Sequence, residues 1–288
     1  MLQRQLGHIV INRIIESECA DVFYNPIGFF PETTPEDWER HKAWLQPHDM
    51  DPESGKLIFA VQAYLLRTSH HTILIDTCNG DHKKRRVPLW NMTTGGTFLA
   101  NLAKAGVQPE AVDYVISTHI HQDHFGGNTT LRDGHWVPTF PNATYIFSRK
   151  EYDFWRAVHQ QKPYEAFDDS ILPIVEAGQA AFVTNDYALD DEVWLEPTPG
   201  HSPDHVCIRL RSNGANAVIT GDLLHSPVQC LETSWANFAE YDRKLARQSR
   251  QTFLEQCCDT DVLVCGMHFP SPSQGHIIRR GDAFWFQY

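Results

Sequence analysis

Four residues of types that bind metal ions lie close together in one short segment. Residues 115–128, VISTHIHQDHFGGN, carry His119, His121, Asp123 and His124 directly after a short apolar run. Imidazole and carboxylate groups are the ligands that zinc and similar divalent cations prefer. A histidine-rich surface loop does not usually follow a buried strand without a break, so the segment predicts a metal site.

Three further candidate ligands follow other predicted strands. His201 comes after a Pro-Gly turn, Asp222 after the apolar run 217–220, and His268 after the predicted strand 261–265. Each occupies the same kind of position as the first cluster, next to glycine or proline at a strand end. The repeated placement indicates that separate strands deliver these side chains to one site.

Other residues near the candidate ligands have predicted supporting roles. Asp76 ends the predicted strand 72–76, where it either orients a ligating histidine through its second ring nitrogen or caps the loop. Gly126 and Gly127 follow the first cluster, and we expect them to let the backbone fold sharply away from it.

The strands and helices that position these residues are predicted from hydrophobic periodicity and turn residues. Strands are predicted at 7–18 (an edge strand), 57–67, 72–76, 111–117, 143–147, 193–197, 217–220, 261–265 and 277–286. One short helix is predicted to begin at Thr34 or Pro35. Three further helices are predicted at 97–105, 148–159 and 236–258. The weak pattern of 160–192 indicates an irregular insertion or lid, and the basic run 82–86 indicates a solvated loop.

Composition and charge limit the functions open to the chain. Its 288 residues are 42% hydrophobic and 21% charged, as in soluble globular proteins. The net charge of −12 disfavours nucleic acids as partners, because phosphate backbones are bound chiefly by Lys and Arg. No apolar run approaches the ~20 residues of a membrane span, and the N-terminus carries no secretion signal, so no membrane is expected as a partner and the cytoplasm is the expected location. The 7 scattered cysteines form no CxxC pair and are expected to be reduced.

The order of the candidate ligands, HxHxDH followed by His, Asp and His, resembles the pattern of the metallo-β-lactamase superfamily. The resemblance covers the chain from about residue 57 to the C-terminus, and it implies a four-layer αββα sandwich with the metal site at one edge of the two sheets. We therefore expect residues 1–288 to form a single α+β domain, with substrate-contacting segments around 25–50 and 160–192. The motif pattern is most similar to that of the N-acyl homoserine lactonase-like branch.

The resemblance implies two divalent metal ions per chain, zinc first, with iron, manganese or cobalt also compatible. The implied ligands are His119, His121 and His201 for the first ion, Asp123, His124 and His268 for the second, and Asp222 as a bridge. Five imidazoles and two carboxylates leave two dications with net positive charge, which favours a bridging hydroxide. A metal-bound water loses its proton near pH 7 instead of at ~15.7, so it becomes a nucleophile at neutral pH.

This arrangement implies a hydrolase that opens a lactone or cleaves a small ester. The hydroxide would attack the substrate carbonyl, and Asp123 could pass a proton to the departing oxygen. An apolar wall for the small-molecule substrate is expected from Phe29, Phe30, Trp38 and Trp90. The aromatic residues near the N-terminus are equally compatible with packing against the core, and also with a homodimer.

His225 marks a departure from the related lactonases, which place a tyrosine at this position against the substrate carbonyl oxygen. A histidine could donate a similar hydrogen bond or act as an acid, so a catalytic role is expected for His225. His205, near His201 in sequence, is expected to pack rather than to act.

Other functions use the same metal site. Hydrolysis of phosphotriesters or of β-lactams would need only a different pocket. An iron-dependent oxygen-using enzyme of the same fold is a further alternative, because His and Asp ligands also suit iron. A nuclease is disfavoured by the acidic balance, and a binding protein without activity is disfavoured because no ligand is missing.

Overall fold

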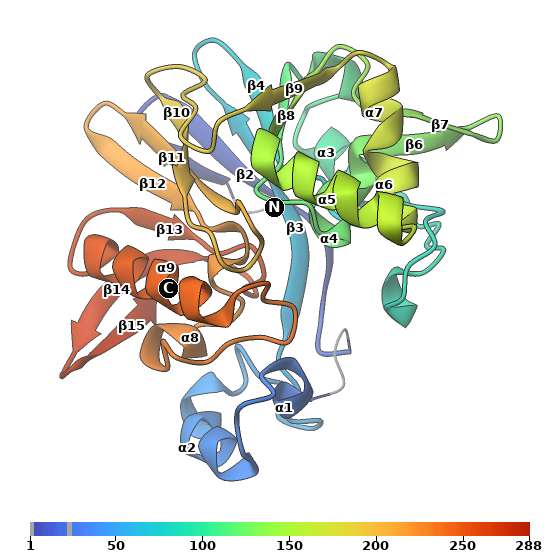
Figure 1. Ribbon diagram of the computed structural model, residues 1–288. Helices are drawn as coiled ribbons and strands as arrows, with labels where there is room; N and C mark the ends of the chain where they lie inside the picture. Colours follow the sequence, from blue (N-terminus) through green and yellow to red (C-terminus); the bar gives the residue numbers. More distant parts are fainter. Residues whose placement is uncertain (1–2, 22–24) are drawn as a thin grey trace.

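In the computed structural model, which describes residues 3–21 and 25–288, two β-sheets pack face to face between two layers of helices (Figure 1). Among the described residues the first sheet is seven-stranded, in the order β1-β2-β3-β4-β5-β8-β9. Its strands are β1 (Gln3–Leu6), β2 (Ile9–Cys19), β3 (Phe59–Arg67), β4 (Thr72–Ile75), β5 (Tyr114–Ile116), β8 (Thr144–Ser148) and β9 (Ala180–Val183).

The second sheet contains the C-terminal strands in sequence order, and it is six-stranded in the described part of the chain. Its strands are β10 (Val193–Pro197), β11 (Val206–Ser212), β12 (Ala215–Ile219), β13 (Leu263–Cys265), β14 (Gln274–Arg280) and β15 (Ala283–Gln287). A separate two-stranded hairpin pairs β6 (Thr129–Arg132) with β7 (His135–Pro138).

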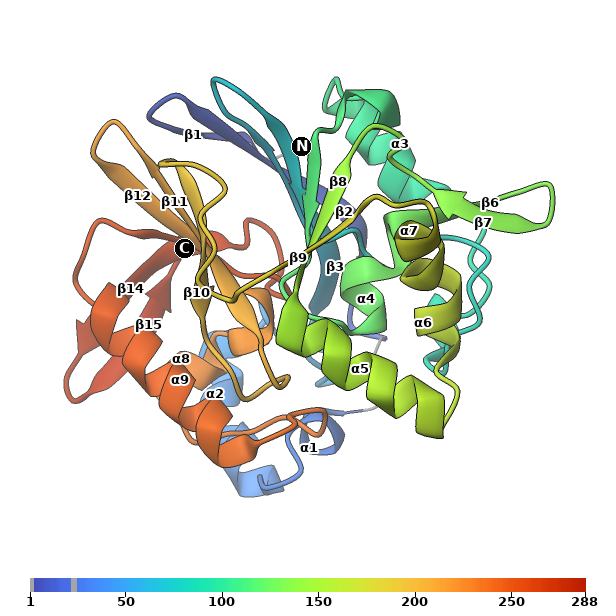
Figure 2. The ribbon, with the colours of Figure 1, turned by 45° about the horizontal axis from the view of Figure 1, so that its top comes forward.

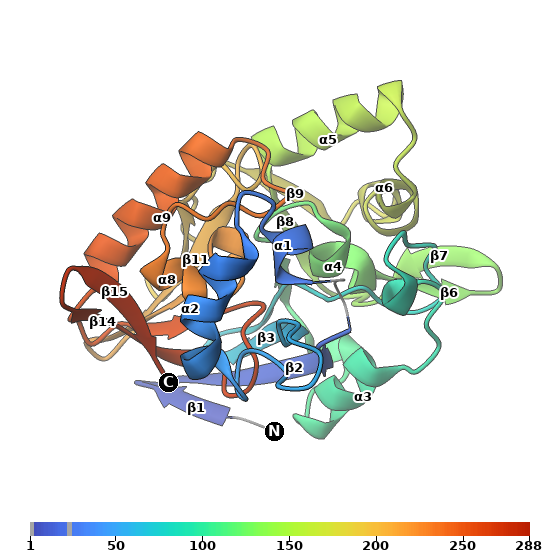
Figure 3. The same ribbon diagram turned by 90° about the horizontal axis from the view of Figure 1, so that it is seen from below.

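Helices cover the outer faces of both sheets (Figure 2). On the side of the first sheet lie α3 (Thr97–Lys104), α4 (Gln122–Phe125), α5 (Arg149–Gln161), α6 (Glu165–Ser170) and α7 (Leu172–Glu176). On the side of the second sheet lie α8 (Val228–Leu231) and α9 (Arg243–Cys257), while α1 (Pro26–Phe29) and α2 (Pro35–Leu45) lie across the lower end of the sandwich (Figure 3). Short 3-10 turns are η1 (Pro88–Trp90), η2 (Pro109–Ala111), η3 (Gly126–Asn128) and η4 (Gly221–Leu223).

The central strand β3 shows why both sheet faces are apolar. Tyr64 and Leu66 contribute to the core between the two sheets, whereas Ala63 and Leu65 contribute to the core under the helices. A strand covered on both faces is apolar at consecutive positions, because successive side chains point to opposite faces. The predicted four-layer αββα sandwich is therefore confirmed.

The parallel strand pairs place the candidate site. β4, β5 and β8 are parallel neighbours in the first sheet, and β12 and β13 are parallel neighbours in the second. The carboxyl ends of parallel strands meet at one edge of a sheet, where ligands bind in folds of this kind. Among the described residues, no helix is both long and apolar enough to cross a membrane.

Two predictions at the ends of the chain were wrong in detail. The predicted edge strand 7–18 corresponds to β2, which lies inside the sheet because a tight turn at Gly7, with φ of +56°, adds β1 as the edge. The predicted strand 277–286 is a hairpin of β14 and β15, which turns at Gly281 with φ of +61°. Positive φ values are accessible to glycine at little cost, and they suit short hairpin turns.

Three predicted segments near the candidate site also differ from the structure. Residues 160–192 are not irregular, since they contain α6, α7 and the sheet strand β9. The helix predicted at 236–258 begins only at Arg243, because Asp242 caps it by accepting the Leu245 N–H. The basic run 82–86 is not a solvated loop, because Lys83 and Arg85 are buried.

Candidate metal centre

The first cluster of candidate ligands follows β5 as predicted. His119 and His121 lie in the connection after the strand, and Asp123 and His124 lie in the short helix α4. The glycine pair has a different purpose from the one predicted, because Gly126 has an ordinary φ of −57°. A Cβ on Gly126 would lie 1.9 Å from the carbonyl oxygen of Asn79, so glycine permits the close approach of two backbone segments.

Two glycines also allow the loops that carry His201 and Asp222. Gly200 has a φ of +131°, and its missing Cβ makes room for the backbone of α9, since a Cβ would lie 2.1 Å from the Ala246 nitrogen. Gly221 has a φ of +51°, and a Cβ there would lie 2.5 Å from Nε2 of His205. Both loops therefore depend on glycine for their shape and their packing.

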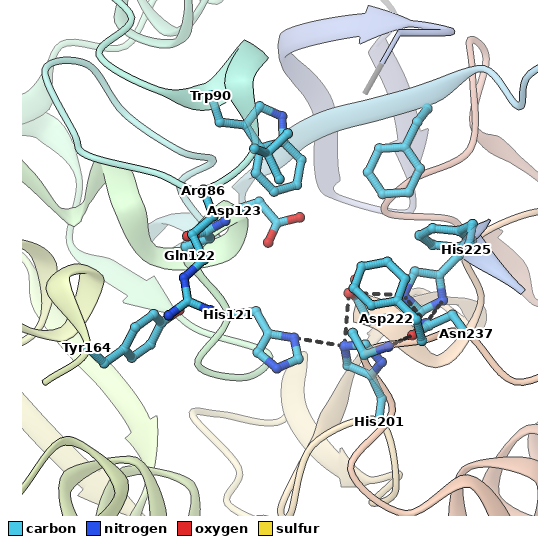
Figure 4. Close-up of a pocket in the computed structure, with 15 residues that line it drawn as sticks. Arg86, Trp90, His121, Gln122, Asp123, Tyr164, His201, Asp222, His225 and Asn237 are labelled. Carbon is cyan, nitrogen blue, oxygen red and sulfur yellow. Dashed lines mark hydrogen bonds and ion pairs between the residues drawn. The ribbon is translucent and has the colours of Figure 1, made fainter. Parts of the chain in front are cut away.

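The two oxygens of Asp222 face different groups of histidines among the candidate ligands. Figure 4 shows Asp222 beside His201 and His225. Oδ2 is 3.1 Å from Nε2 of His201 and 3.6 Å from Nε2 of His119. Oδ1 is 3.0 Å from Nε2 of His124 and 2.7 Å from Nε2 of His268. One carboxylate thus lies between two sets of imidazole nitrogens.

The predicted residues come together in groups compact enough to hold metal ions. In each group the donor atoms lie within 4.8 Å of one another. The groups found among the described residues are His119, His121, His201 and Asp222; Asp123, His124 and His268; and Asp222, His225 and His268. The first two groups contain the residues that the family resemblance implies for the two ions. Asp222, the implied bridge, is a member of the first group but not of the second.

Two donor atoms of this cluster are buried without a hydrogen-bond partner. They are Nε2 of His119 and Oδ1 of Asp222, which touches imidazoles without hydrogen-bond geometry. Leaving such atoms unsatisfied costs about 1–3 kcal/mol each. Divalent cations would satisfy them, so the residues present fit a metal centre.

The electrostatics of the histidines favour the same interpretation. Burial and the neighbouring imidazoles lower the pKa of His119 and of His121 well below the usual value, so both rings are neutral and can donate electron pairs. Burial acts in the same direction on His124, but the carboxylates of Asp222, Asp123 and Asp76 outweigh it and raise the pKa of His124 well above its usual value. Carboxylates packed this densely favour a cation among them.

Residues behind the cluster orient its histidines. Oδ2 of Asp76 is 2.8 Å from Nδ1 of His124, the contact expected of a carboxylate that orients a candidate ligand. The backbone carbonyl of Ala60 lies 2.8 Å from Nδ1 of His268 and fixes that ring in the same way. Outer contacts of this kind leave Nε2 of each ring free for the centre.

His205 supports the cluster from behind Asp222. The Asp222 N–H donates to Nε2 of His205 at 2.9 Å, and Nδ1 of His205 is 2.8 Å from the Thr198 hydroxyl. Burial and the neighbouring His201 hold the pKa of His205 at about 3, so Nε2 remains an acceptor. Its predicted packing role agrees with these contacts.

A cavity of about 370 Å³ opens onto the cluster. The lining residues from the cluster are His121, Asp123, His201, Asp222 and His225. The other lining residues are Phe29, Phe59, Arg86, Val87, Trp90, Gln122, Tyr164, Asn237, Phe238 and Ala239.

The predicted aromatic wall is correct for two of its four residues. Phe29 and Trp90 line the cavity, whereas Phe30 and Trp38 are buried in the core and are absent from its lining. Sequence reasoning missed Phe59 and Tyr164, because nothing in a strand or in a weakly patterned segment identifies a pocket residue. Phe238 also lines the cavity. The sequence did not identify it as a pocket residue, because residues 236–258 were wrongly predicted to form a helix that includes it.

His225 lies between the cluster and the cavity. Its Nε2 is 3.1 Å from Oδ2 of Asp222 and 2.9 Å from Nδ2 of Asn237. Burial lowers the pKa of His225 to about 3, although Asp222 opposes the shift, so the ring is neutral at pH 7. Asn237, which the sequence did not indicate, is the only side chain outside the cluster that the described contacts place on this ring as a hydrogen-bond partner.

Comparison with curated proteins finds bacterial lactonases. An N-acyl homoserine lactonase of Bacillus thuringiensis is 30% identical over 177 residues, which are 57% of this chain and 64% of that protein. The aligned part therefore spans less than two thirds of this relative's length. An N-acyl homoserine lactonase of a Bacillus species is 29% identical over 210 residues, which are 68% of this chain and 76% of that protein.

Comparison with solved structures finds the same fold over nearly the whole chain. The hydrolase AbOPH, of the beta lactamase superfamily, has a TM-score of 0.81 at 24% identity, with 99% of this chain and 95% of that chain covered. AidC, a dizinc quorum-quenching lactonase in complex with a product, has a TM-score of 0.79 at 23% identity, with 99% and 96% covered. The model of one protein family matches residues 58–268, a span that contains the whole histidine and aspartate cluster. The chain therefore belongs to the metallo-beta-lactamase superfamily.

Proposed function

We propose that this protein is a dinuclear metal-dependent hydrolase that opens lactones or cleaves small esters. The observation that carries the proposal is the position of Asp222, whose two oxygens face separate sets of histidines at the base of an apolar-walled cavity. The lactonases among the curated relatives support the substrate class.

The proposed ligands follow from the two compact groups and from the position of Asp222. They are His119, His121 and His201 for one ion, Asp123, His124 and His268 for the other, and Asp222 for both. Zinc suits these nitrogen and oxygen donors, and iron, manganese or cobalt would accept them too. When bound, such ions lower the pKa of a coordinated water and polarise a carbonyl oxygen.

The chain's own residues would bind and orient the substrate. Phe29, Trp90 and Phe238 provide an apolar wall, which would exclude water from the scissile bond. His225 is held by Asn237 beside Asp222, where an N–H of the ring could donate to the substrate carbonyl oxygen. Asp123 lines the same cavity, and its carboxyl group could carry a proton to the departing alkoxide.

Metal analysis combined with a hydrolysis panel tests the proposal. Purified protein should contain two metal ions per chain and hydrolyse lactones or aryl esters faster than phosphotriesters or β-lactams. Asp222→Ala should lose metal and at least about 100-fold in kcat/KM, since metal assistance contributes several kcal/mol. The control Asp186→Ala removes an exposed aspartate and should change neither quantity.

Several outcomes would contradict the proposal. Unchanged hydrolysis by Asp222→Ala would exclude the mechanism. Preferred turnover of phosphotriesters or β-lactams would assign the same centre to a different substrate class. An iron chromophore with oxygen uptake, and no hydrolysis, would favour the oxygen-using alternative.

A further inference from the structure

The basic run 82–86 alternates between buried and exposed cations. Lys83 and Arg85 are buried, whereas Lys84 and Arg86 are exposed. An exposed loop with this composition would normally have no fixed conformation. The alternation indicates instead that two cations anchor the segment and two face outward.

The anchors are specific and come from α6 and β6. Both terminal guanidinium nitrogens of Arg85 contact the carboxylate of Asp169, Nη1 to Oδ2 at 2.7 Å and Nη2 to Oδ1 at 3.0 Å. Nζ of Lys83 donates to the Ser170 hydroxyl at 3.0 Å and to the Asp169 carbonyl at 3.1 Å, and also to the Thr129 hydroxyl. A buried bidentate pair of this kind fixes geometry more firmly than an exposed contact.

Arg86 follows the anchored Arg85 in the sequence and precedes η1. It lines the cavity above the candidate metal centre. Figure 4 shows it on the same wall as Gln122, Asp123 and Tyr164, across from His201 and His225. Among the described lining residues it is the only charged one besides the two proposed aspartate ligands. The described residues provide no ion-pair partner for it, in contrast to Arg85.

The charge of the cavity points to the kind of substrate that this arginine selects. With two dications bound and both aspartates ionised, the site would carry excess positive charge, and Arg86 adds to it. A neutral lactone offers a guanidinium only uncharged acceptors, whereas a carboxylate has the opposite charge and matches its planar fork. The surrounding chain is acidic, with a net charge of −12, so the positive cavity is a local feature.

We propose that Arg86 makes the enzyme selective for esters or lactones that carry a second group, a carboxylate, away from the bond that is cleaved. This inference rests on the proposed hydrolase function. Because Arg86 is exposed, its ion pair with a substrate is partly screened by water, and it should contribute a moderate selectivity.

Two matched esters test the selectivity. The 4-nitrophenyl half-ester of adipic acid has a free carboxylate, and the corresponding ester of adipamic acid has a neutral amide in its place. The wild-type enzyme should prefer the anionic ester about threefold to tenfold in kcat/KM, mainly through KM. Arg86→Gln should lower kcat/KM for the anionic ester more than for the neutral ester and so abolish the preference, and Arg86→Lys should retain part of it.

Binding without turnover provides an independent measurement. Adipate and hexanoate each offer one carboxylate to the metal centre, but only adipate has a second one for Arg86. Calorimetry should show tighter binding of adipate to the wild type and equal binding of both to Arg86→Gln. The matched control Lys84→Gln removes the neighbouring exposed cation, which does not line the cavity, and should behave like the wild type.

The outcomes separate the two proposals. Hydrolysis of both esters at equal rates by wild type and Arg86→Gln would overturn the role of Arg86 and leave the hydrolase function intact. If the wild-type enzyme hydrolysed neither of the esters and no lactone, the hydrolase function would be overturned. An equal loss of kcat/KM for both esters in Arg86→Gln would also contradict selection by Arg86. The same holds if Lys84→Gln changed the preference as much as Arg86→Gln did.

Discussion

Asp76 holds the ring of His124 through a 2.8 Å contact between Oδ2 and Nδ1, so that Nε2 of His124 faces Asp222 at 3.0 Å. The same carboxylate accepts the N–H and the hydroxyl of Thr118, each at 2.8 Å. One side chain at the end of β4 therefore fixes both a candidate ligand and the start of the segment that carries the first cluster. Asp76 has a φ of +60°, a value that Asp and Asn tolerate better than other side chains except glycine.

Asp76→Asn is expected to lower metal affinity about 10–100-fold, because loss of an outer carboxylate weakens the histidine that it orients. Asn tolerates the backbone conformation, so the fold should persist. Metal content after dialysis against a graded chelator measures the effect, with circular dichroism as the test of folding. The control is Asp113→Asn, which changes an exposed aspartate directly before β5, at the end of that strand away from the candidate ligands. Equal metal retention in both variants would show that Asp76 serves only the loop.

His225→Phe is expected to lower turnover about 10–100-fold while leaving two metal ions in place, because the ring would lose its hydrogen bond to the substrate. His225→Tyr, which introduces the residue of related lactonases, should restore part of the activity. Turnover and metal content are measured on the same preparations. Loss of an ion from His225→Phe would instead make His225 a ligand, as its proximity to Asp222 and His268 would allow.

The candidate ligands could be predicted because metal-binding chemistry restricts residue type and because strand ends restrict position. His119, His201, Asp222 and His268 each follow a predicted strand, and the structure brings them together. Burial of both faces of β3 likewise makes its apolar run readable from the sequence. The single-domain organisation and the homodimer remain predictions.

The walls of the cavity could not be predicted, because they depend on contacts between distant segments. Lys83 and Arg85 are buried beside Asp169, whose carboxylate forms an ion pair with each of them and which lies in a segment with weak patterning. Phe29, Phe30 and Trp38 all belong to one buried core cluster, yet of the three only Phe29 also lines the cavity. A short-range pattern records polarity, whereas the choice between core and pocket is made by tertiary packing.

Arg85→Met is expected to lower the free energy of unfolding by about 3 kcal/mol, because it leaves the buried Asp169 carboxylate without its bidentate partner. Lys83, with Nζ 3.6 Å from Oδ1 of Asp169, compensates only in part. Urea denaturation of the metal-loaded protein measures the loss. Lys84→Met, the exposed neighbour, should stay within about 0.5 kcal/mol of the wild type. Equal stabilities of the two variants would contradict the anchoring role on which the position of Arg86 depends.

Glu16 should make stability depend on pH. Its carboxylate accepts the N–H groups of Asn79 and Gly80, both at 3.0 Å, next to the loop that carries Asp76. Burial outweighs these hydrogen bonds and raises the pKa of Glu16 from 4.5 to about 7. The folded protein therefore binds this proton more tightly than the unfolded chain, and the contribution of Glu16 to stability is lost as pH rises through this window.

Glu16→Gln cannot titrate, so its stability relative to the wild type should increase between pH 4.5 and 8. The expected change is about 1–3 kcal/mol, a range that allows for partial exposure of the side chain to solvent. Urea denaturation of both proteins at a series of pH values measures the difference, and groups common to both proteins, including the metal ligands, cancel in it. A difference that stays constant over this range, or that falls with pH, would mean that Glu16 is ionised in the folded protein throughout and that its two backbone hydrogen bonds outweigh its burial.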